Sequence, residues 1–341
     1  MKRLLLGGFF AAVLAALLGA YVLKTQVDGF VAATPSASHD ERVLEIPKGA
    51  GPRSVSRILA DAGVVTDAEH FYYFLRWRKA APKLRAGEYR FWTDLTPDEV
   101  LDLLASAPEV TRPITFPEGL RIEDMAKIVG SSGFGTEAEY LSLARDPAYI
   151  GAAGLPVDPA PKSLEGYLLP DTYEFPREVD TKMIVDAQVK AFRDLWDERR
   201  AGRARELKMT ANEVVTLASV VEKETGAAEE RPHIAGVFHL RLKKRMKLQS
   251  DPTIIYGLKN YDGDIRFSDI RRPHPWNTYV IDGIPPSPIA GPGKAAIDAV
   301  LWPKETKDLF FVSRNDGTHH FSETYAEHAR MVRRFQSRRN K

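Results

Sequence analysis

The sequence predicts an α+β fold in three parts: an N-terminal transmembrane helix, a small βα module and a larger mixed α+β domain. The 341-residue chain has room for about two domains at the usual domain size. Its first residues are almost entirely apolar, whereas strand-like and helix-like segments alternate along the remainder. We expect the helix with a short cytoplasmic tip at 1–24, a tether at 25–41, the module at 42–111 and the larger domain at 112–341.

The composition excludes several classes of protein. Charged residues make up 28% of the chain and apolar residues 44%, which is ordinary for a globular protein and excludes extended disorder. A net charge of +2 gives no basic field that would gather nucleic acid. The chain has no cysteine, and its eight histidines include no His-x-x-x-His pair. We therefore predict no metal, no cofactor and no nucleic-acid partner.

The run from Leu4 to Leu23 predicts a membrane anchor. Its 20 residues contain no charged or strongly polar side chain, and as a helix they would span about 30 Å. A cleaved signal peptide is the alternative, although its apolar region is usually about 7 to 15 residues long. Lys2 and Arg3 precede the run, which places the N-terminus in the cytoplasm and exports the rest. The small and polar residues 31–40 suit a short tether.

A strand-turn-helix pattern recurs after the tether. Residues 42–63 predict a strand, a Pro-Lys-Gly turn and an amphipathic helix closed by glycine. Residues 112–133 repeat this order at the same offsets, with Pro-Glu-Gly as the turn. Residues 87–104 form a weaker third copy. Units of this kind occur in glycan-binding modules, and a common βα arrangement without a ligand explains the pattern equally well.

An aromatic segment and a charged segment follow. In residues 164–173, aromatic rings could present Glu165 and Asp171 beside stacking surfaces and so form one wall of a site. A buried aromatic turn is an equally good interpretation. Residues 182–207, rich in both signs of charge, predict one long solvated helix.

The best-marked helix begins at Thr210, where Thr-Ala-Asn-Glu forms a capping box, and Gly226 predicts its end. Apolar residues at helical spacing from Val214 form a stripe that we expect to be buried. Glu222 and Glu224 border this stripe at the last turn, and Glu224 lies slightly closer to it.

Carboxylates at the C-terminus of a helix break a local rule, because the partial negative charge there favours cations. Burial and the helix end would both raise the pKa of such a Glu, which is what a general acid acting near neutral pH requires. On the residues alone, the plainer interpretation is that Glu222, Glu224 or both pair with Arg231 or Lys223 at the surface.

Three further segments complete the chain. Residues 241–248 contain five cations, which we interpret as a solvated helix face. The Pro-rich loop at 283–293 could form the rigid rim of a cleft. Residues 310–312 predict a strand, and an Asn-Asp-Gly turn separates them from His319-His320-Phe321.

Taken together, these motifs resemble the YceG-like endolytic murein transglycosylases. The similarity covers the whole chain, including the anchor. One departure is Gly291, where the family often has asparagine. The motifs occur in the family's order: Leu164-Glu165-Gly166-Tyr167 with Pro170-Asp171-Thr172-Tyr173, Ala218 to Thr225, Gln249-Ser250-Asp251-Pro252-Thr253, Asn277-Thr278-Tyr279, and Gly283-Ile284-Pro285-Pro286.

The resemblance implies a single-pass protein of the inner (cytoplasmic) membrane, with a LysM-like module at 42–111 and a periplasmic catalytic domain that cleaves nascent peptidoglycan. It implies glycan strands as substrate and peptidoglycan synthases as possible partners. The second Glu of its Glu-Lys-Glu-Thr motif, Glu224 here, would be the catalytic acid and base. Candidates for binding substrate or supporting Glu224 are Glu222, Glu165, Asp171, Tyr173, Gln249, Asp251, Thr253, Asn277 and Tyr279.

The implied reaction needs only one carboxyl group. Protonated Glu224 would protonate the oxygen of the MurNAc-GlcNAc β-1,4 bond, and the carboxylate would then take a proton from the muramyl 6-hydroxyl, which closes a 1,6-anhydro ring. Two alternatives remain open. One is a hydrolase that uses Glu224 with Asp171 or Asp251. The other is a non-catalytic glycan-binding anchor that recruits wall-synthesis enzymes.

Overall fold

The computed structural model describes residues 14, 17–19, 21–22, 24–80, 84–106, 108–258 and 261–336. The chain divides into two compact units. The first comprises Met1–Arg112 and Phe175–Glu178, and the second comprises Pro113–Glu174 and Val179–Lys341. The short segment Phe175–Glu178 therefore belongs to the first unit, although both of its flanks belong to the second.

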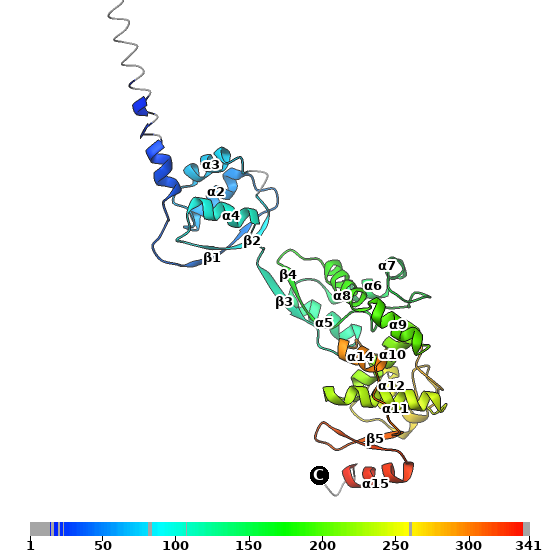
Figure 1. Ribbon diagram of the computed structural model, residues 1–341. Coiled ribbons are helices and arrows are strands. Elements are labelled where there is room, and N and C mark those ends of the chain that lie inside the picture. The colour runs from blue at the N-terminus through cyan, green and yellow to red at the C-terminus, as the bar shows by residue number, and fades with distance from the viewer. Residues whose placement is uncertain are drawn as a thin grey trace, which may run out of the picture. The chain divides into compact units, whose positions relative to one another are not determined.

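The first unit is a two-stranded antiparallel sheet that shares its core with three helices (Figure 1). The strands pair with Val43 opposite Arg90. On one strand Tyr89 and Phe91 fill the core, and Arg90 between them is exposed. The elements, in chain order, are β1 (Glu41–Ile46), α2 (Pro52–Asp61), α3 (Ala68–Trp77), β2 (Gly87–Trp92) and α4 (Pro97–Ser106).

The predicted strand-turn-helix pattern is confirmed at 42–63 and 87–104, where β1–α2 and β2–α4 form. Gly63 follows α2 with a φ of +70°, a backbone conformation that glycine adopts without strain. Helix α3, which lies between the two copies in the chain, was not predicted from the sequence. Asp67 begins this helix by accepting a hydrogen bond from the backbone N–H of His70 at 2.8 Å.

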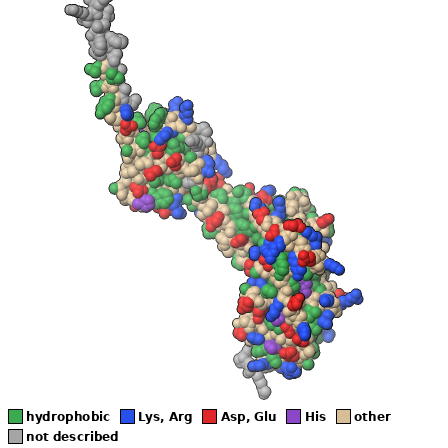
Figure 2. Space-filling model, viewed as in Figure 1, with side chains coloured by type: hydrophobic (Ala, Val, Ile, Leu, Met, Phe, Trp, Pro, Cys, Tyr) green, Lys and Arg blue, Asp and Glu red, His purple; other side chains and the backbone are tan. Residues whose placement is uncertain are grey.

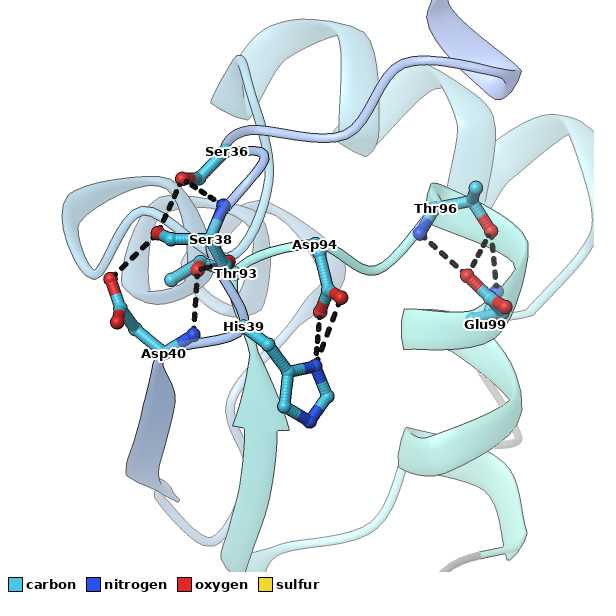
Figure 3. Close-up of polar contacts among 8 residues, drawn as sticks. All are labelled: Ser36, Ser38, His39, Asp40, Thr93, Asp94, Thr96 and Glu99. Atoms are coloured by element: carbon cyan, nitrogen blue, oxygen red, sulfur yellow. Dashed lines mark hydrogen bonds and ion pairs between the residues drawn. The ribbon is translucent and has the colours of Figure 1, made fainter.

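The segment 25–41, which was expected to be a free tether, is largely bound to the rest of the first unit (Figure 3). Residues 24–31 are helical, and Phe30 packs against the core of the unit. The Thr93 hydroxyl donates to the carbonyl of Ser38 at 2.6 Å, and the His39 ring lies 2.9 Å from the Asp94 carboxylate. The small polar side chains that suggested a linker hydrogen-bond to one another, and the backbone of Ser36, Ser38 and Asp40 hydrogen-bonds to Thr93, directly after β2.

The predicted transmembrane helix falls mainly on residues 1–13, 15–16, 20 and 23, which lie outside the described residues. Within the described part of the chain, the structure contains no helix that is both long enough and apolar enough to cross a bilayer.

The second unit is mostly helical and contains the small two-stranded sheet β5–β6 and most of the sheet β3–β4, of which residues 111–112 and 175–176 belong to the first unit. The sheet β5–β6 confirms the strand predicted at 310–312. The elements are β3 (Thr111–Thr115), α5 (Ile122–Ser132), α6 (Glu137–Arg145), α7 (Pro147–Ala152), β4 (Thr172–Pro176), α8 (Thr181–Leu195), α9 (Glu198–Glu206), α10 (Ala211–Glu224), the 3-10 turn η2 (Ala228–Glu230), α11 (Arg231–Lys243), α12 (Asp251–Gly257), α13 (Phe267–Arg271), α14 (Lys294–Leu301), β5 (Phe310–Ser313), β6 (His319–Ser322) and α15 (Tyr325–Gln336).

Helix α10 lies at the centre of this unit and contacts α11, α12 and α14. Its predicted capping box is confirmed, with the Thr210 hydroxyl and the Glu213 carboxylate satisfying each other's backbone N–H groups. The predicted single buried stripe was too narrow, because every residue from Val214 to Glu222 is buried. Neighbouring helices contact α10 on several sides, which a single sequence pattern does not reveal.

One other prediction needs correction. The single helix expected at 182–207 is interrupted, because Asp197 caps a new helix, α9, by accepting a hydrogen bond from the backbone N–H of Arg200 at 2.9 Å. The strand-turn-helix copy predicted at 112–133 is confirmed by β3 and α5, and its strand pairs with β4.

Candidate active site

The last turn of α10 carries three charged residues with different surroundings. The helix ends at Glu224 because Thr225 adopts an extended backbone conformation, with φ −142° and ψ 138°. The Lys223 ammonium donates a hydrogen bond to the carbonyl of Gly119 at 3.1 Å. Glu222 is buried and Glu224 is half-buried.

Glu222 forms a buried ion pair. Its Oε1 accepts a hydrogen bond from Arg231 Nη2 at 2.8 Å, and its Oε2 accepts one from the backbone N–H of Gly293 at 3.0 Å. Arg231 also contacts Glu118 at 3.3 Å. Burial and the charge of Glu222 raise the pKa of Glu118 above its usual value. Pairing with Arg231, expected as the plainer interpretation, therefore holds for Glu222, and it occurs inside the protein.

The Pro-rich loop is joined to the Pro-Glu-Gly turn beside this ion pair. Gly291 accepts a hydrogen bond from the backbone N–H of Gly119 and donates one to the carbonyl of Leu120, both at 2.8 Å. A Cβ atom on Gly293 would lie 1.7 Å from the Glu118 carboxylate, and one on Gly291 would lie 2.8 Å from Cε of Met125.

Glu224 has no such partner. Within the described residues it forms no ion pair, and burial raises the pKa of Glu224 to about 7. The charge of Asp251 raises this pKa further, while the Ser250 hydroxyl and the Arg241 guanidinium lower it. At neutral pH a large fraction of Glu224 therefore carries a proton that it can donate.

Two of the predicted motifs meet beside Glu224. The backbone N–H of Ser250 donates to Oγ1 of Thr278 at 2.9 Å, and the same oxygen lies 2.9 Å from the Thr253 hydroxyl. Asp251 accepts a hydrogen bond from the Tyr279 hydroxyl at 2.6 Å. The hydroxyl of Thr253, which is fully buried, therefore joins segment 249–253 to segment 277–279.

Arg241, which the sequence placed on a solvated helix face, is a functional residue that was not predicted. It is buried, and its Nε donates to the carbonyl of Leu309 at 2.7 Å. Its Nη1 donates to the carbonyl of Leu248. Burial lowers the pKa of Arg241, whereas the charge of Glu224 raises it. Within a run of cations, no sequence pattern distinguishes this residue from its exposed neighbours.

Asn277 and Gln249 have contrasting environments. The Asn277 side-chain amide donates to the carbonyls of Asp269, Ile270 and Arg272 at 2.9–3.1 Å. Its carbonyl oxygen accepts the backbone N–H of Tyr279, so the side chain is occupied within the protein. Gln249 is exposed and has a φ of +51°, an uncommon and strained conformation for a residue other than glycine.

The remaining candidates lie on other elements. Glu165 is buried against the start of α5, where its carboxylate accepts a hydrogen bond from the backbone N–H of Ile122 at 3.3 Å. Burial raises the pKa of Glu165 to about 8. Asp171 is exposed. The Tyr173 hydroxyl donates to the carbonyl of Leu169 at 2.7 Å. Residues 164–170 are all buried, as the aromatic-turn interpretation expected.

The described residues contain no cluster of three or more His, Asp or Glu side chains that could hold a metal ion.

Known proteins resemble this chain over most of its length. It is 28% identical over 310 residues to the endolytic murein transglycosylase of Bacillus subtilis, covering 87% of this chain and 85% of the relative. It is 28% identical over 316 residues to the protein of the same name from Streptococcus pneumoniae strain D39, covering 84% of this chain and 57% of that relative. The chain thus spans little more than half the length of the pneumococcal protein.

A solved structure is also similar to this chain. The crystal structure of a YceG-like protein from Listeria monocytogenes matches with a TM-score of 0.60 and 27% identity, over 85% of this chain and 98% of that one. A family model for YceG-like proteins matches residues 44–334. The chain therefore belongs to the YceG-like family.

Proposed function

We propose that this chain is an endolytic peptidoglycan lytic transglycosylase. It cleaves the MurNAc-GlcNAc β-1,4 bond of nascent glycan strands, leaves a 1,6-anhydro-MurNAc end and so terminates strand elongation. The family and the names of its relatives support an enzyme of the lyase class. The observation that carries the proposal is Glu224, an unpaired carboxyl group at the end of a buried helix with a pKa of about 7.

The reaction begins with protonated Glu224. It donates its proton to the glycosidic oxygen as that oxygen leaves and positive charge develops at the anomeric carbon. The carboxylate so formed accepts the proton of the muramyl 6-hydroxyl, whose oxygen bonds to the anomeric carbon. The proton count balances, no water is consumed, and Glu224 ends the cycle protonated.

Neighbouring groups balance the two states of Glu224. Asp251 favours the protonated form that begins the reaction, and the Tyr279 hydroxyl holds the Asp251 side chain in place. The Ser250 hydroxyl and the Arg241 guanidinium favour the carboxylate that forms midway. A pKa near neutrality lets one residue serve as acid and then as base.

The other candidate residues divide into contact and support roles. Gln249, exposed beside Asp251, contacts the glycan. Thr253 and Asn277 hold the two motif segments in place through the hydrogen bonds described above. Glu222 positions the end of α10 through Arg231. Glu165 fixes the start of α5, and Asp171 and Tyr173 bind substrate.

The remaining parts bring the enzyme to its substrate. Residues 42–111 bind glycan as a LysM-like module, which the small βααβα unit supports. The apolar run at 4–23 anchors the chain in the inner membrane with the catalytic part in the periplasm. Peptidoglycan synthases are the partners expected at that location.

Product analysis tests the reaction. Purified protein is incubated with uncross-linked glycan strands, and the new ends are analysed by mass spectrometry and by borohydride reduction. We expect ends lighter than hydrolysed ends by one water and resistant to reduction. Reducible ends would instead indicate a hydrolase, with Asp171 or Asp251 as the second carboxylate. Glycan binding without cleavage would indicate a scaffold.

A further inference from the structure

Helix α3 of the first unit has an exposed aromatic face. Its other face, with Phe71, Phe74 and Leu75, lies in the core of the unit. On the exposed face, Tyr73 is 56% exposed and Trp77 is 65% exposed. Large aromatic side chains that are this exposed and this close together often mark a binding surface.

The helical residues 24–31 lie beside this face. The Phe30 ring lies 5.6 Å from the ring of His70, near the start of α3. Val27 and the two exposed aromatic residues line a hollow of about 270 Å³. Val27 is four residues beyond the end of the apolar run at 4–23. Four residues advance a helix by about 6 Å, comparable with the headgroup layer of a bilayer.

Positive charge accompanies the aromatic face. The Arg78 guanidinium, which also pairs with Asp98, lies 5.2 Å from the centre of the Trp77 ring. Between Phe71 and Ala86 the sequence has five Lys or Arg residues and no Asp or Glu. Figure 2 shows hydrophobic side chains next to Lys and Arg side chains on the first unit. This combination is typical of protein surfaces at the level of lipid headgroups, where the rings and the cations both find partners.

We propose that the α3 face, formed by Tyr73, Trp77, Arg76, Arg78 and Lys79, binds the anionic lipid surface of the bilayer that residues 4–23 span. The inference rests on the proposed membrane anchoring. Chain continuity favours lipid over a second protein, because the helix that covers one side of this face follows directly on the proposed span. The first unit is then held at the membrane surface.

Single-cysteine labelling tests this proposal in the full chain, because the protein has no cysteine of its own. Tyr73→Cys reports on the α3 face, and Leu14→Cys reports on the apolar run. Val43→Cys, on an exposed residue of β1, is the matched control. Each variant is labelled with bimane and reconstituted in vesicles of phosphatidylcholine with or without phosphatidylglycerol. Brominated lipid and aqueous iodide serve as quenchers.

We expect brominated lipid to quench the labels at 14 and 73 but not the label at 43. We expect iodide to reach the label at 73 about ten times less readily than the label at 43 in vesicles with phosphatidylglycerol. Adding Arg76→Gln and Lys79→Gln should weaken lipid quenching at 73 in those vesicles and change it less in phosphatidylcholine alone.

The outcomes separate the two proposals. If the label at 14 is in lipid while the label at 73 behaves like the one at 43, the α3 proposal is wrong and the anchoring stands. If the label at 14 is in water, both are wrong. A label at 73 that is protected from iodide but not quenched by brominated lipid would show that protein covers this face, which also overturns the proposal. An unchanged far-UV spectrum confirms that each variant is folded.

Discussion

Glu222 and Glu224 lie in the same turn of α10, yet their surroundings differ. Glu222 is enclosed by Arg231 and the backbone N–H of Gly293, so both of its oxygens are satisfied. Glu224 interacts with Ser250, Asp251 and Arg241, and among the residues that the structure describes it forms no ion pair. The helix end contributes the same electrostatic environment to both residues. The difference therefore comes from the neighbouring segments, which make one carboxylate structural and leave the other free to exchange a proton.

Replacing the free carboxylate should have the largest effect. We expect Glu224→Gln to reduce glycan cleavage about a thousand-fold, since it keeps the shape of the side chain and removes the transferable proton. Anhydromuramyl ends released per minute are the measurement. Glu229→Gln, the same substitution at an exposed glutamate of η2, should cleave at the wild-type rate. Full activity in Glu224→Gln would show that another group is the acid.

Breaking the buried pair should destabilise the protein. Arg231→Met leaves the buried Glu222 without its cation, and we expect a loss of about 3 kcal/mol in the free energy of unfolding, measured in urea. Glu118→Gln removes the longer and more exposed of the two contacts of Arg231 and should cost less than about 1 kcal/mol. Equal losses in the two variants would contradict the distinction drawn between these contacts.

The protonation of Glu224 should make stability depend on pH. In the unfolded chain Glu224 ionises near pH 4.5, and in the folded protein near pH 7. Between these values the folded state retains a proton that the unfolded state has released, so rising pH destabilises the wild type relative to Glu224→Gln, by up to about 3 kcal/mol. The difference should level off above about pH 7. Urea unfolding of both proteins across this range measures it, and a difference independent of pH would contradict it.

The smallest expected effect is on the pH profile of cleavage. Activity should fall as pH rises through about 7, because less Glu224 is protonated. Tyr279→Phe removes the hydrogen bond that the Tyr279 hydroxyl donates to Asp251. The negative charge of Asp251 should then raise the pKa of Glu224 further, so the fall in activity should shift to higher pH, by less than about one pH unit. Tyr261→Phe is the matched control on an exposed tyrosine. A downward shift in Tyr279→Phe would show that Asp251 does not act on Glu224 as described.

Local signals explain why part of this site was predictable. The capping box at Thr210 marked the start of α10. Glu222 and Glu224 were identifiable because carboxylates are unfavourable at the C-terminus of a helix. Which of the two pairs with Arg231 depends on how α11 and the Pro-rich loop pack, and no short-range pattern encodes that packing. Arg241 was missed for the same reason, since its partners include a carbonyl at position 309.

The fold shows the same limit. Strands and capped helices of the first unit followed from periodicity and glycine positions, whereas α3 was missed because its aromatic residues lie on both faces. The interruption before α9 depends on the cap at Asp197, which the charge pattern of residues 182–207 concealed. Burial of α10 on several sides reflects contacts from helices distant in the chain.

The segment Phe175–Glu178 determines how the protein can be divided. Arg177 pairs with Glu45 at 2.9 Å and Lys48 pairs with Glu178 at 2.6 Å, so these residues complete the first unit. The chain consequently passes between the units three times, at 112–113, 174–175 and 178–179. A protease that cuts between residues 112 and 113 leaves residues 1–112 bound to the rest of the first unit, residues 175–178, only through non-covalent contacts such as these ion pairs. A truncation at residue 112 yields a first unit that lacks residues 175–178. A fusion of 1–112 to 175–178 is the smallest protein that contains all of the first unit.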